Sequence, residues 1–286
     1  MSADLNALLA ALDVLQATDR VDLARRVGAH ALPVFSALLA VLLLAVALTW
    51  WLVRTHGVPL AHRRLPPAGV VPVFGAVGFG LVLGAAALFA EIAAQLGPEA
   101  TMARADAALA AAIGAHASRA TLQTFATLTH FGDTLTLALL GTGVTLLLWR
   151  QRQRALLLGW MLAVGGNALL NPALKRIFER VRPAHEHGLV NELSWSFPSG
   201  HTSGSTVAYC MLAYLALRLL PAVWHLPAVL AASALAFTVG SSRIFLQVHY
   251  ASDVAAGFAS GLAWLAVCIA SVELGRHYRR RGGGGD

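Results

Sequence analysis

Three short stretches of the sequence concentrate side chains able to do chemistry in a chain that is otherwise apolar. They carry basic groups, imidazoles, a carboxylate and a small polar turn: Lys175 and Arg182, the Pro-Ser-Gly-His segment at 198–201, and Arg243, His249 and Asp253. Only 12% of all residues are charged, and Lys175 is the only lysine of the chain. Such groups in such a background predict a site that handles a charged ligand.

The basic side chains and the small polar turn predict that this ligand is a phosphate. Arginine presents a planar fork that binds two phosphate oxygens at once, whereas lysine supplies a compact point charge. Ser199 and Gly200 directly precede an apolar run, so their backbone N–H groups and the positive end of a helix dipole form an anion site. The residues predicted to bind phosphate are Lys175, Arg182, Ser199, Gly200 and Arg243.

The two histidines are predicted to have different roles. His249 and Asp253 are four residues apart, so if a helix has begun there they share one face and lie within hydrogen-bonding reach. A carboxylate on one ring nitrogen leaves the lone pair of the other nitrogen free to attack phosphorus. His201 would donate a proton to the leaving alkoxide and later accept one from water. Because the cations already neutralise the phosphate oxygens, this chemistry needs no metal ion.

Each stretch also has a simpler interpretation when it is taken alone. Lys175 and Arg182 are also typical of a helix end that reaches the lipid headgroups. Ser199 is typical of an ordinary helix cap, and His249 of a histidine that an acid at a helix start satisfies. The prediction of a phosphate site therefore depends on the three stretches acting together.

The elements that must position these residues are predicted to be membrane-spanning helices. Hydrophobic residues make up 57% of the 286 residues, and seven runs are long enough, or nearly so, to cross the ~30 Å hydrocarbon core. With so many spans, the net charge of +7 is assigned to arginines in cytoplasmic loops and not to nucleic-acid binding. The runs are Ala31–Val53, Ala68–Ala90, Phe131–Trp149, Ala155–Leu174, Thr202–Leu217, Leu226–Gly240 and Val254–Val272.

The distribution of arginines predicts how the chain sits in the membrane. With seven spans, one side of the membrane collects eleven arginines against two acidic residues, and the other side has ten basic against twelve acidic residues. Loops rich in arginine stay in the cytoplasm. We therefore expect a multi-pass protein of the plasma (inner) membrane with a cytoplasmic C-terminus. Residues 175–202 and 241–253, and the active site with them, would face the extracytoplasmic side.

Taken together, the three stretches resemble the signature motifs of the type 2 phosphatidic acid phosphatase superfamily. The matching patterns are Lys175-x6-Arg182-Pro183, Pro198-Ser199-Gly200-His201 and Ser242-Arg243-x5-His249-x3-Asp253, in the order of that family and at the ends of spans. The resemblance implies a six-helix core and a metal-free reaction through a phosphohistidine. By analogy His249 is the nucleophile, His201 the general acid and base, and Asp253 the residue that orients His249.

The resemblance covers about residues 68–272 and suggests a division of the chain. We predict an all-α, polytopic transmembrane bundle, in which one extra N-terminal transmembrane helix is added to the six-helix core. Residues 1–67 would hold an amphipathic segment and this accessory helix, residues 68–274 the phosphatase-like membrane domain, and residues 275–286 a basic, flexible cytoplasmic tail. The sequence predicts no cofactor and leaves the oligomeric state open.

The function predicted from these residues is hydrolysis of a lipid phosphate at the membrane surface. Candidate substrates are phosphatidate, phosphatidylglycerol phosphate and undecaprenyl diphosphate, of which an outward-facing site favours the last. A lipid phosphotransferase would use the same intermediate, and a membrane scaffold or lipid carrier with a vestigial site is a third interpretation. A vanadate-dependent haloperoxidase would share the anion site, but such proteins are soluble.

Other polar residues carry weaker predictions. Asn167 and Asn171 are expected to hold helices together, while Glu91 and Asp133 are expected to reach water or pair with an arginine. The His-Glu-His segment at 185–187 is expected to be a solvated loop near the lipid headgroups. Residues 96–130 are expected to form one or two surface helices.

Overall fold

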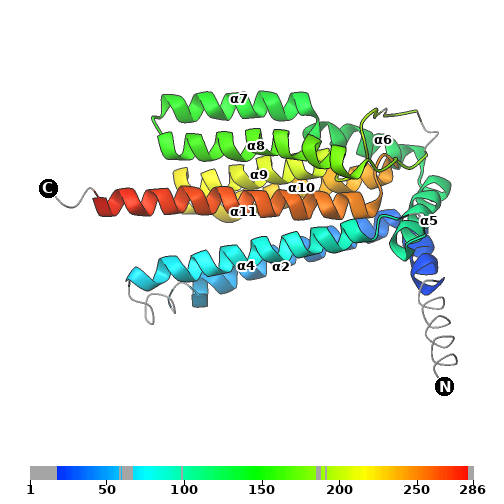
Figure 1. Ribbon diagram of the computed structural model, residues 1–286, viewed down its shortest axis with the longest axis horizontal. Coiled ribbons are helices and arrows are strands. Elements are labelled where there is room, and N and C mark those ends of the chain that lie inside the picture. Colours follow the sequence, from blue (N-terminus) through cyan, green and yellow to red (C-terminus); the bar gives the residue numbers. More distant parts are fainter. Residues whose placement is uncertain are drawn as a thin grey trace, which may run out of the picture.

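Seven long helices lie side by side and form a bundle in the computed structural model, which describes residues 18–57, 59, 67–97, 99–184, 188–190 and 192–282 (Figure 1). Each helix contains most of one predicted apolar run, and no strand occurs among the described residues. The prediction of an all-α bundle is therefore confirmed. The helices are α2 (Ala31–Leu52), α4 (Pro67–Ala94), α7 (Thr134–Arg150), α8 (Arg154–Phe178), α9 (Gly200–Leu219), α10 (His225–Phe245) and α11 (Ala251–Gly282).

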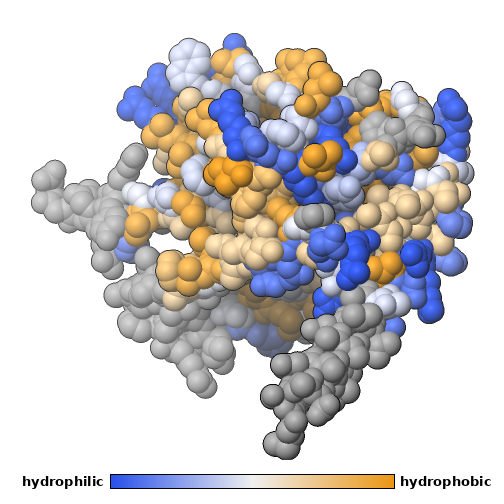
Figure 2. Space-filling view, turned by 45° about the vertical axis from the view of Figure 1, so that its right-hand side comes forward, coloured by the Kyte–Doolittle hydropathy of each residue, from blue (hydrophilic) through white to orange (hydrophobic). Residues whose placement is uncertain are grey.

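The outer surface of the bundle is that of a multi-pass membrane protein. Helix α2 has no buried residue, and Leu44 on it is 70% exposed. The segments that contain α2, α7, α8, α10 and α11 are each long and apolar enough to cross a membrane. Figure 2 shows large hydrophobic side chains at the surface beside hydrophilic ones. An exposed apolar surface this extensive requires lipid around it.

Helix α9 forms the centre of the bundle and packs against α8, α10 and α11. Its contact with α11 is close because Gly257 and Gly261 of α11 face it. A Cβ atom at Gly257 would lie 2.9 Å from the carbonyl oxygen of Ser199, and one at Gly261 would lie 3.1 Å from that of Ser203. Small residues four apart allow two helix backbones to approach in this way.

Shorter helices gather at one end of the bundle, on the right in Figure 1. They are α5 (Thr101–His116) and α6 (Arg119–Leu128), followed by a 3-10 turn at Thr129–Gly132. These elements agree with the surface helices expected over residues 96–130. Residues 18–29 are also helical, as the predicted amphipathic segment requires, whereas residues 1–17 lie outside the described part of the chain.

Several helix ends differ from their predicted positions. Helix α7 begins only after Asp133, which is its N-cap residue, and α8 continues beyond the apolar run to include Lys175. Helix α11 begins at Ala251, so His249 precedes the helix and does not belong to its first turn. At the other end α11 continues through residues 275–282, where the sequence predicts a flexible tail; residues 283–286 lie outside the described residues.

Candidate active site

The predicted site residues come together at the same end of the bundle as α5 and α6, because the helices alternate in direction. Lys175 lies in the last turn of α8 and Arg243 in the last turn of α10. His201 and Asp253 lie in the first turns of α9 and α11. Arg182 and His249 lie in the two loops that connect these helices, at 179–199 and 246–250.

His249 is buried beside Asp253, although the reason differs from the predicted one. The two residues do not share a helix face. Instead, the chain turns at Tyr250, whose backbone N–H donates to Asp253 Oδ2 at 2.8 Å, as in a capping box. His249 Nδ1 lies 3.5 Å from Asp253 Oδ2, which is long for a hydrogen bond. The hydroxyl of Ser196 bridges the two groups, because it lies 3.3 Å from Nδ1 and donates to Oδ2.

The other ring nitrogen of His249 faces the cations. Arg182 Nη1 lies 3.0 Å from His249 Nε2, and since a guanidinium only donates, Nε2 accepts and Nδ1 carries the proton. This is the tautomer that a nucleophilic Nε2 requires. Burial lowers the pKa of His249 from 6.5 to about 3, so the ring is neutral at physiological pH.

Arg182, Arg243 and Lys175 form one cluster of cations around the loop 192–195. Arg182 and Lys175 both donate to the Ser194 hydroxyl, at 3.0 and 3.1 Å. Arg243 is completely buried; its Nη1 donates to Thr129 Oγ1 at 2.8 Å and its Nη2 donates to the carboxylate of Glu192. Among the described residues, Arg243 Nε is a buried side-chain nitrogen with no hydrogen-bond partner. The cluster therefore retains donor capacity for an anion.

His201 is held by a carboxylate of its own. Its Nε2 lies 2.9 Å from Asp133 Oδ1, at the start of α7, while its Nδ1 faces Glu192 Oε1 at 4.0 Å. Asp133 Oδ2 also pairs with His130 Nδ1 at 2.7 Å. The Asp133 side chain is 37% exposed and so reaches water as expected, but its partners are two histidines and not an arginine.

Ser199 and Gly200 stand at the start of α9, as the sequence predicts, but one N–H group of the predicted anion site is already used. The N–H of Ser199 donates to the backbone oxygen of Asp253 at 3.0 Å, and its hydroxyl accepts from Thr202 at 2.9 Å. Gly200 lies against α8, since a Cβ there would be 2.9 Å from Asn171 Oδ1. The geometry joins the start of α9 to Asp253 and leaves the phosphate role of Ser199 a prediction.

Sequence reasoning missed several residues that complete the site. Arg180 Nη1 donates to Asp253 Oδ1 at 2.7 Å, and Ser196 bonds to Asp253 on its other oxygen. Glu192 contacts Arg182, Arg243 and His201. Arg180 lies within the Lys175-x6-Arg182 motif and Ser196 lies two residues before Pro198, and that proximity was the only available signal. Nothing in the local sequence indicates that Glu192 or Asp106 belongs to the site. Asp106 joins it through a contact with Arg180.

The remaining polar residues behave mostly as structural groups. Asn171 Nδ2 donates to Pro198 O at 3.4 Å and to Ser203 Oγ at 3.2 Å, so it connects α8 to α9 as expected. Glu91, near the end of α4, accepts a hydrogen bond from the side chain of Gln95, which lies just after that helix. The segment 185–187 lies outside the described residues. Within the described ranges no three His, Cys, Asp or Glu side chains are grouped as metal ligands.

Comparison with known proteins gives consistent matches. A family model described as the PAP2 superfamily matches residues 154–276. Phosphatidylglycerophosphatase B of Bacillus subtilis is 42% identical over 104 residues, which are 36% of this chain and about half (51%) of that protein. Decaprenylphosphoryl-5-phosphoribose phosphatase of Mycobacterium tuberculosis is 35% identical over 165 residues, covering 54% of this chain and 81% of that protein.

A solved structure is also similar to this fold. It is the crystal structure of a transmembrane PAP2-type phosphatidylglycerolphosphate phosphatase from Bacillus subtilis, with a TM-score of 0.60 and 30% sequence identity. The alignment covers 67% of this chain and 96% of that one. About a third of this chain therefore lies outside the alignment with that structure.

Proposed function

Because this chain belongs to the PAP2 superfamily, we propose that it is a membrane-bound lipid phosphatase that works through a phosphohistidine. The observation that carries the proposal is the setting of the His249 ring. Its Nδ1 faces Ser196 and Asp253, and its Nε2 faces Arg182 within the cation cluster. A ring so held presents a lone pair at the position where cations would hold a phosphate.

The proposed reaction has two steps. In the first, His249 Nε2 attacks phosphorus and the lipid alkoxide leaves, taking a proton from His201. In the second, water attacks the phosphohistidine while His201 accepts a proton from it, so that inorganic phosphate leaves and His249 is restored. Asp253 stabilises the positive charge on the His249 ring in both steps, and Asp133 holds His201 through Nε2 at 2.9 Å.

The phosphate would be held by the cations named above. Lys175, Arg182 and Arg243 surround the position that the Glu192 carboxylate takes between Arg182 and Arg243. The free Nε of Arg243 supports the same role, because a buried donor without a partner is costly unless a ligand uses it. Ser199 and Gly200 are proposed to add the start of α9 to this site.

The proposed substrate is a phosphate ester carried by a membrane lipid. The site lies at one end of a bundle whose sides are apolar, so a substrate with its phosphate at the headgroup level keeps its tail in the bilayer. The names of both curated relatives describe a phosphatase acting on a lipid phosphate. The first name supports phosphatidylglycerol phosphate and the second supports a phosphorylated polyprenyl lipid, whereas phosphatidate and undecaprenyl diphosphate are left for the test. From the arginine distribution, we place the site on the extracytoplasmic face of the plasma membrane.

The test is release of inorganic phosphate by the detergent-solubilised protein in the presence of EDTA. The substrates are phosphatidylglycerol phosphate, phosphatidate and undecaprenyl diphosphate. His249→Ala is compared with His225→Ala, since His225 is half-buried, bonds to Leu220 O and lies at the opposite end of α10 from Arg243. We expect release that persists with EDTA, disappears in His249→Ala and is unchanged in His225→Ala.

A second measurement identifies the intermediate. Substrate labelled with radioactive phosphate should leave an acid-labile, base-stable label on the intact protein and none on His249→Ala. Absence of phosphate release from every lipid would overturn the hydrolase. Label transfer to an added lipid alcohol would then indicate a phosphotransferase, and absence of any label would indicate a vestigial site.

A further inference from the structure

Helix α5 contacts the segment that carries His249 and Asp253, although it lies outside residues 154–276 that match the family. Two residues before His249, the side chain of Gln247 donates through Nε2 to Ala110 O of α5 at 2.8 Å. Three residues after His249, the N–H of Ser252 donates to Asp106 Oδ1 at 3.2 Å and the Ser252 hydroxyl donates to Oδ2. Helix α5 is therefore attached to the chain on both sides of His249.

Asp106 is also linked to Asp253 through Arg180. Arg180 Nη2 donates to Asp106 Oδ2 at 3.0 Å, and its Nη1 donates to Asp253 Oδ1 at 2.7 Å. The guanidinium lies over the Tyr250 ring, 4.3 Å from its centroid. The side chains of Asp106, Arg180 and Asp253 are 6%, 10% and 0% exposed. The three buried groups thus form a chain of alternating charge, in which the positive Arg180 lies between the negative Asp106 and Asp253.

The order of these charges has a consequence for His249. Arg180 alone would offset the charge of Asp253 and weaken its support for a positive imidazole ring. Asp106 offsets Arg180 in turn, so the three groups leave one net negative charge beside His249. Because they are buried, water screens these interactions little. Removing Asp106 would leave Arg180 paired with Asp253 alone, and removing Arg180 would leave two buried carboxylates without their cation.

We propose, on the basis of the phosphohistidine mechanism above, that Asp106 is a positioning residue for the reaction. It holds Arg180 and Ser252 so that Asp253 keeps its orientation and its charge toward His249. Asp106 itself does not contact the reacting atoms. The proposal gives α5, which precedes the matched residues 154–276, a part in catalysis.

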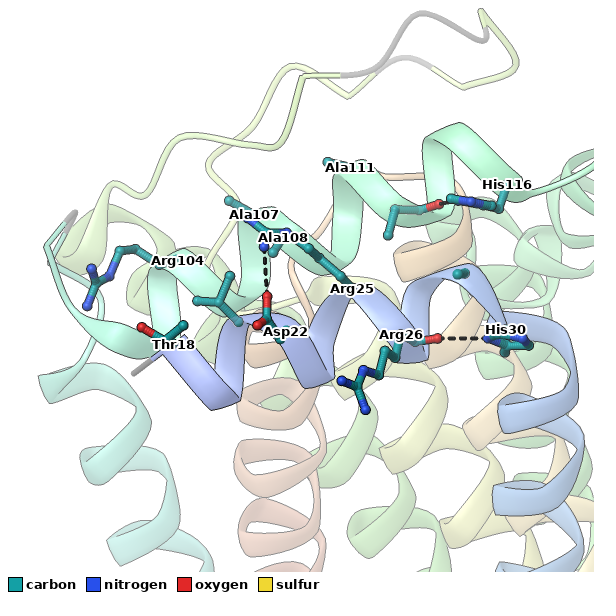
Figure 3. Close-up of a pocket in the computed structure, with 13 residues that line it drawn as sticks. Thr18, Asp22, Arg25, Arg26, His30, Arg104, Ala107, Ala108, Ala111 and His116 are labelled. Atoms are coloured by element: carbon teal, nitrogen blue, oxygen red, sulfur yellow. Dashed lines mark hydrogen bonds and ion pairs between the residues drawn. The ribbon is translucent and has the colours of Figure 1, made fainter. Parts of the chain in front are cut away.

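The N-terminal helix at residues 18–29 supports α5 from its other side. Figure 3 shows these two helices next to each other, with Ala107, Ala108 and Ala111 of α5 among the residues between them. A Cβ atom at Gly28 would lie 2.6 Å from Ala112 Cβ and 2.9 Å from Leu109 O. This close contact fixes α5 between the N-terminal helix and the loop that carries His249.

The test is the isosteric change Asp106→Asn, with Asp22→Asn as its control. Asp22 lies on the N-terminal helix and pairs with the exposed Arg25 at 2.8 Å, away from His249. Loss of a residue that orients a metal ligand typically lowers activity ~10–100-fold, and by analogy we expect kcat of Asp106→Asn to fall by about that factor. KM should change little, since the phosphate ligands remain. Asp22→Asn should have the kcat and KM of the wild type.

A double mutant separates positioning from a merely structural role. If Asp106 acts partly through Arg180 and partly through Ser252, then Asp106→Asn lowers kcat by a smaller factor in an Arg180→Gln background than in the wild type. Additive losses, or an unchanged kcat in Asp106→Asn alone, would overturn the proposal.

If Asp106→Asn does not fold, Ser252→Ala carries the test, because it removes one hydroxyl and keeps all three charges. A lower kcat at unchanged KM is then expected, and a wild-type kcat would contradict the proposal. An inactive wild-type protein would instead refute the proposed function.

Discussion

Glu192 places its carboxylate among the side chains that are predicted to bind phosphate. It accepts from Arg243, lies 3.7 Å from Arg182 Nη2 and faces His201 at 4.0 Å. A carboxylate between two guanidinium groups offers the same kind of oxygen atoms as a phosphate. The unliganded site therefore holds an anion of its own, and an incoming phosphate has to displace it or share the cations with it.

This arrangement predicts that Glu192→Gln binds inorganic phosphate more tightly. The change removes a like charge from the phosphate position and keeps the size of the side chain. A partly exposed charge contact is worth about 1 kcal/mol, so the inhibition constant of phosphate should fall roughly fivefold. Product inhibition of lipid hydrolysis measures it. Glu179→Gln, an exposed residue of the same loop, is the control. An inhibition constant that rises in Glu192→Gln would mean that Glu192 organises the arginines and does not compete with phosphate.

The buried His249 also predicts how stability depends on pH. Its pKa is about 3 in the folded protein and 6.5 as a free side chain, so between these values the unfolded state binds the additional proton. Stability from this group is complete above pH 6.5 and declines as the pH falls toward 3. His249→Gln lacks the proton site, so its melting temperature should fall less than that of the wild type between pH 7 and pH 4.5. Parallel declines in the two proteins would show that other groups control acid unfolding.

The contact between α9 and α11 connects the two halves of the candidate site. Ser199 at the start of α9 donates its N–H to the backbone oxygen of Asp253 in α11. One turn further along α11, Gly257 lies against the carbonyl oxygen of Ser199 and against the side chain of Thr202. The absence of a side chain at Gly257 therefore sets how closely His201 approaches His249 and Asp253.

We expect Gly257→Ala to impair both stability and activity. Its Cβ would lie 2.9 Å from Ser199 O and from Thr202 Cβ, and a backbone atom cannot move aside as a flexible side chain can. Overpacking of this kind typically costs about 1–3 kcal/mol. Gly275→Ala is a matched control in the same helix, because no atom lies within 4 Å of the added Cβ. Thermal unfolding and phosphate release should separate the two variants; equal behaviour would show that α9 and α11 can move apart without consequence.

For the molecule as a whole, the site and the C-terminal end of α11 lie at opposite ends of the bundle (Figure 1). The opposite end carries Arg54, Arg150, Arg152 and Arg218 among the described arginines. Since arginine-rich loops remain in the cytoplasm, the site is predicted to face outward. The bundle fixes the two ends relative to each other, whereas the charges predict which end faces which compartment.

Single cysteines at the two ends test this orientation in intact cells. Arg119 on α6 and Gln151 after α7 are both exposed. We expect a membrane-impermeant thiol reagent to label Arg119→Cys from outside and Gln151→Cys only after the membrane is permeabilised. The native Cys210 and Cys268 lie within α9 and α11, so the unsubstituted protein provides the background. The reverse pattern would place the site in the cytoplasm.

The sequence by itself determined the seven helices and the three stretches of the candidate site. Apolar runs long enough for a bilayer are a local property, and so is the spacing of Lys175 and Arg182 or of His249 and Asp253. Even here the spacing along one helix does not explain the contact, because His249 meets Asp253 across the Tyr250 turn. Charged side chains are costly to place in an apolar chain, and their rarity here is what indicated these residues as a site.

Only the tertiary structure decided which groups surround the histidines. Asp133 meets His201 across 68 positions, Ser252 meets Asp106 across 146, and Glu192 meets Arg243 across 51. Such pairs leave no periodic signal, since they arise where helix ends and loops are brought together by packing along the whole bundle. Sequence spacing fixes what one helix face presents, but the partners on other elements follow from how the helices pack.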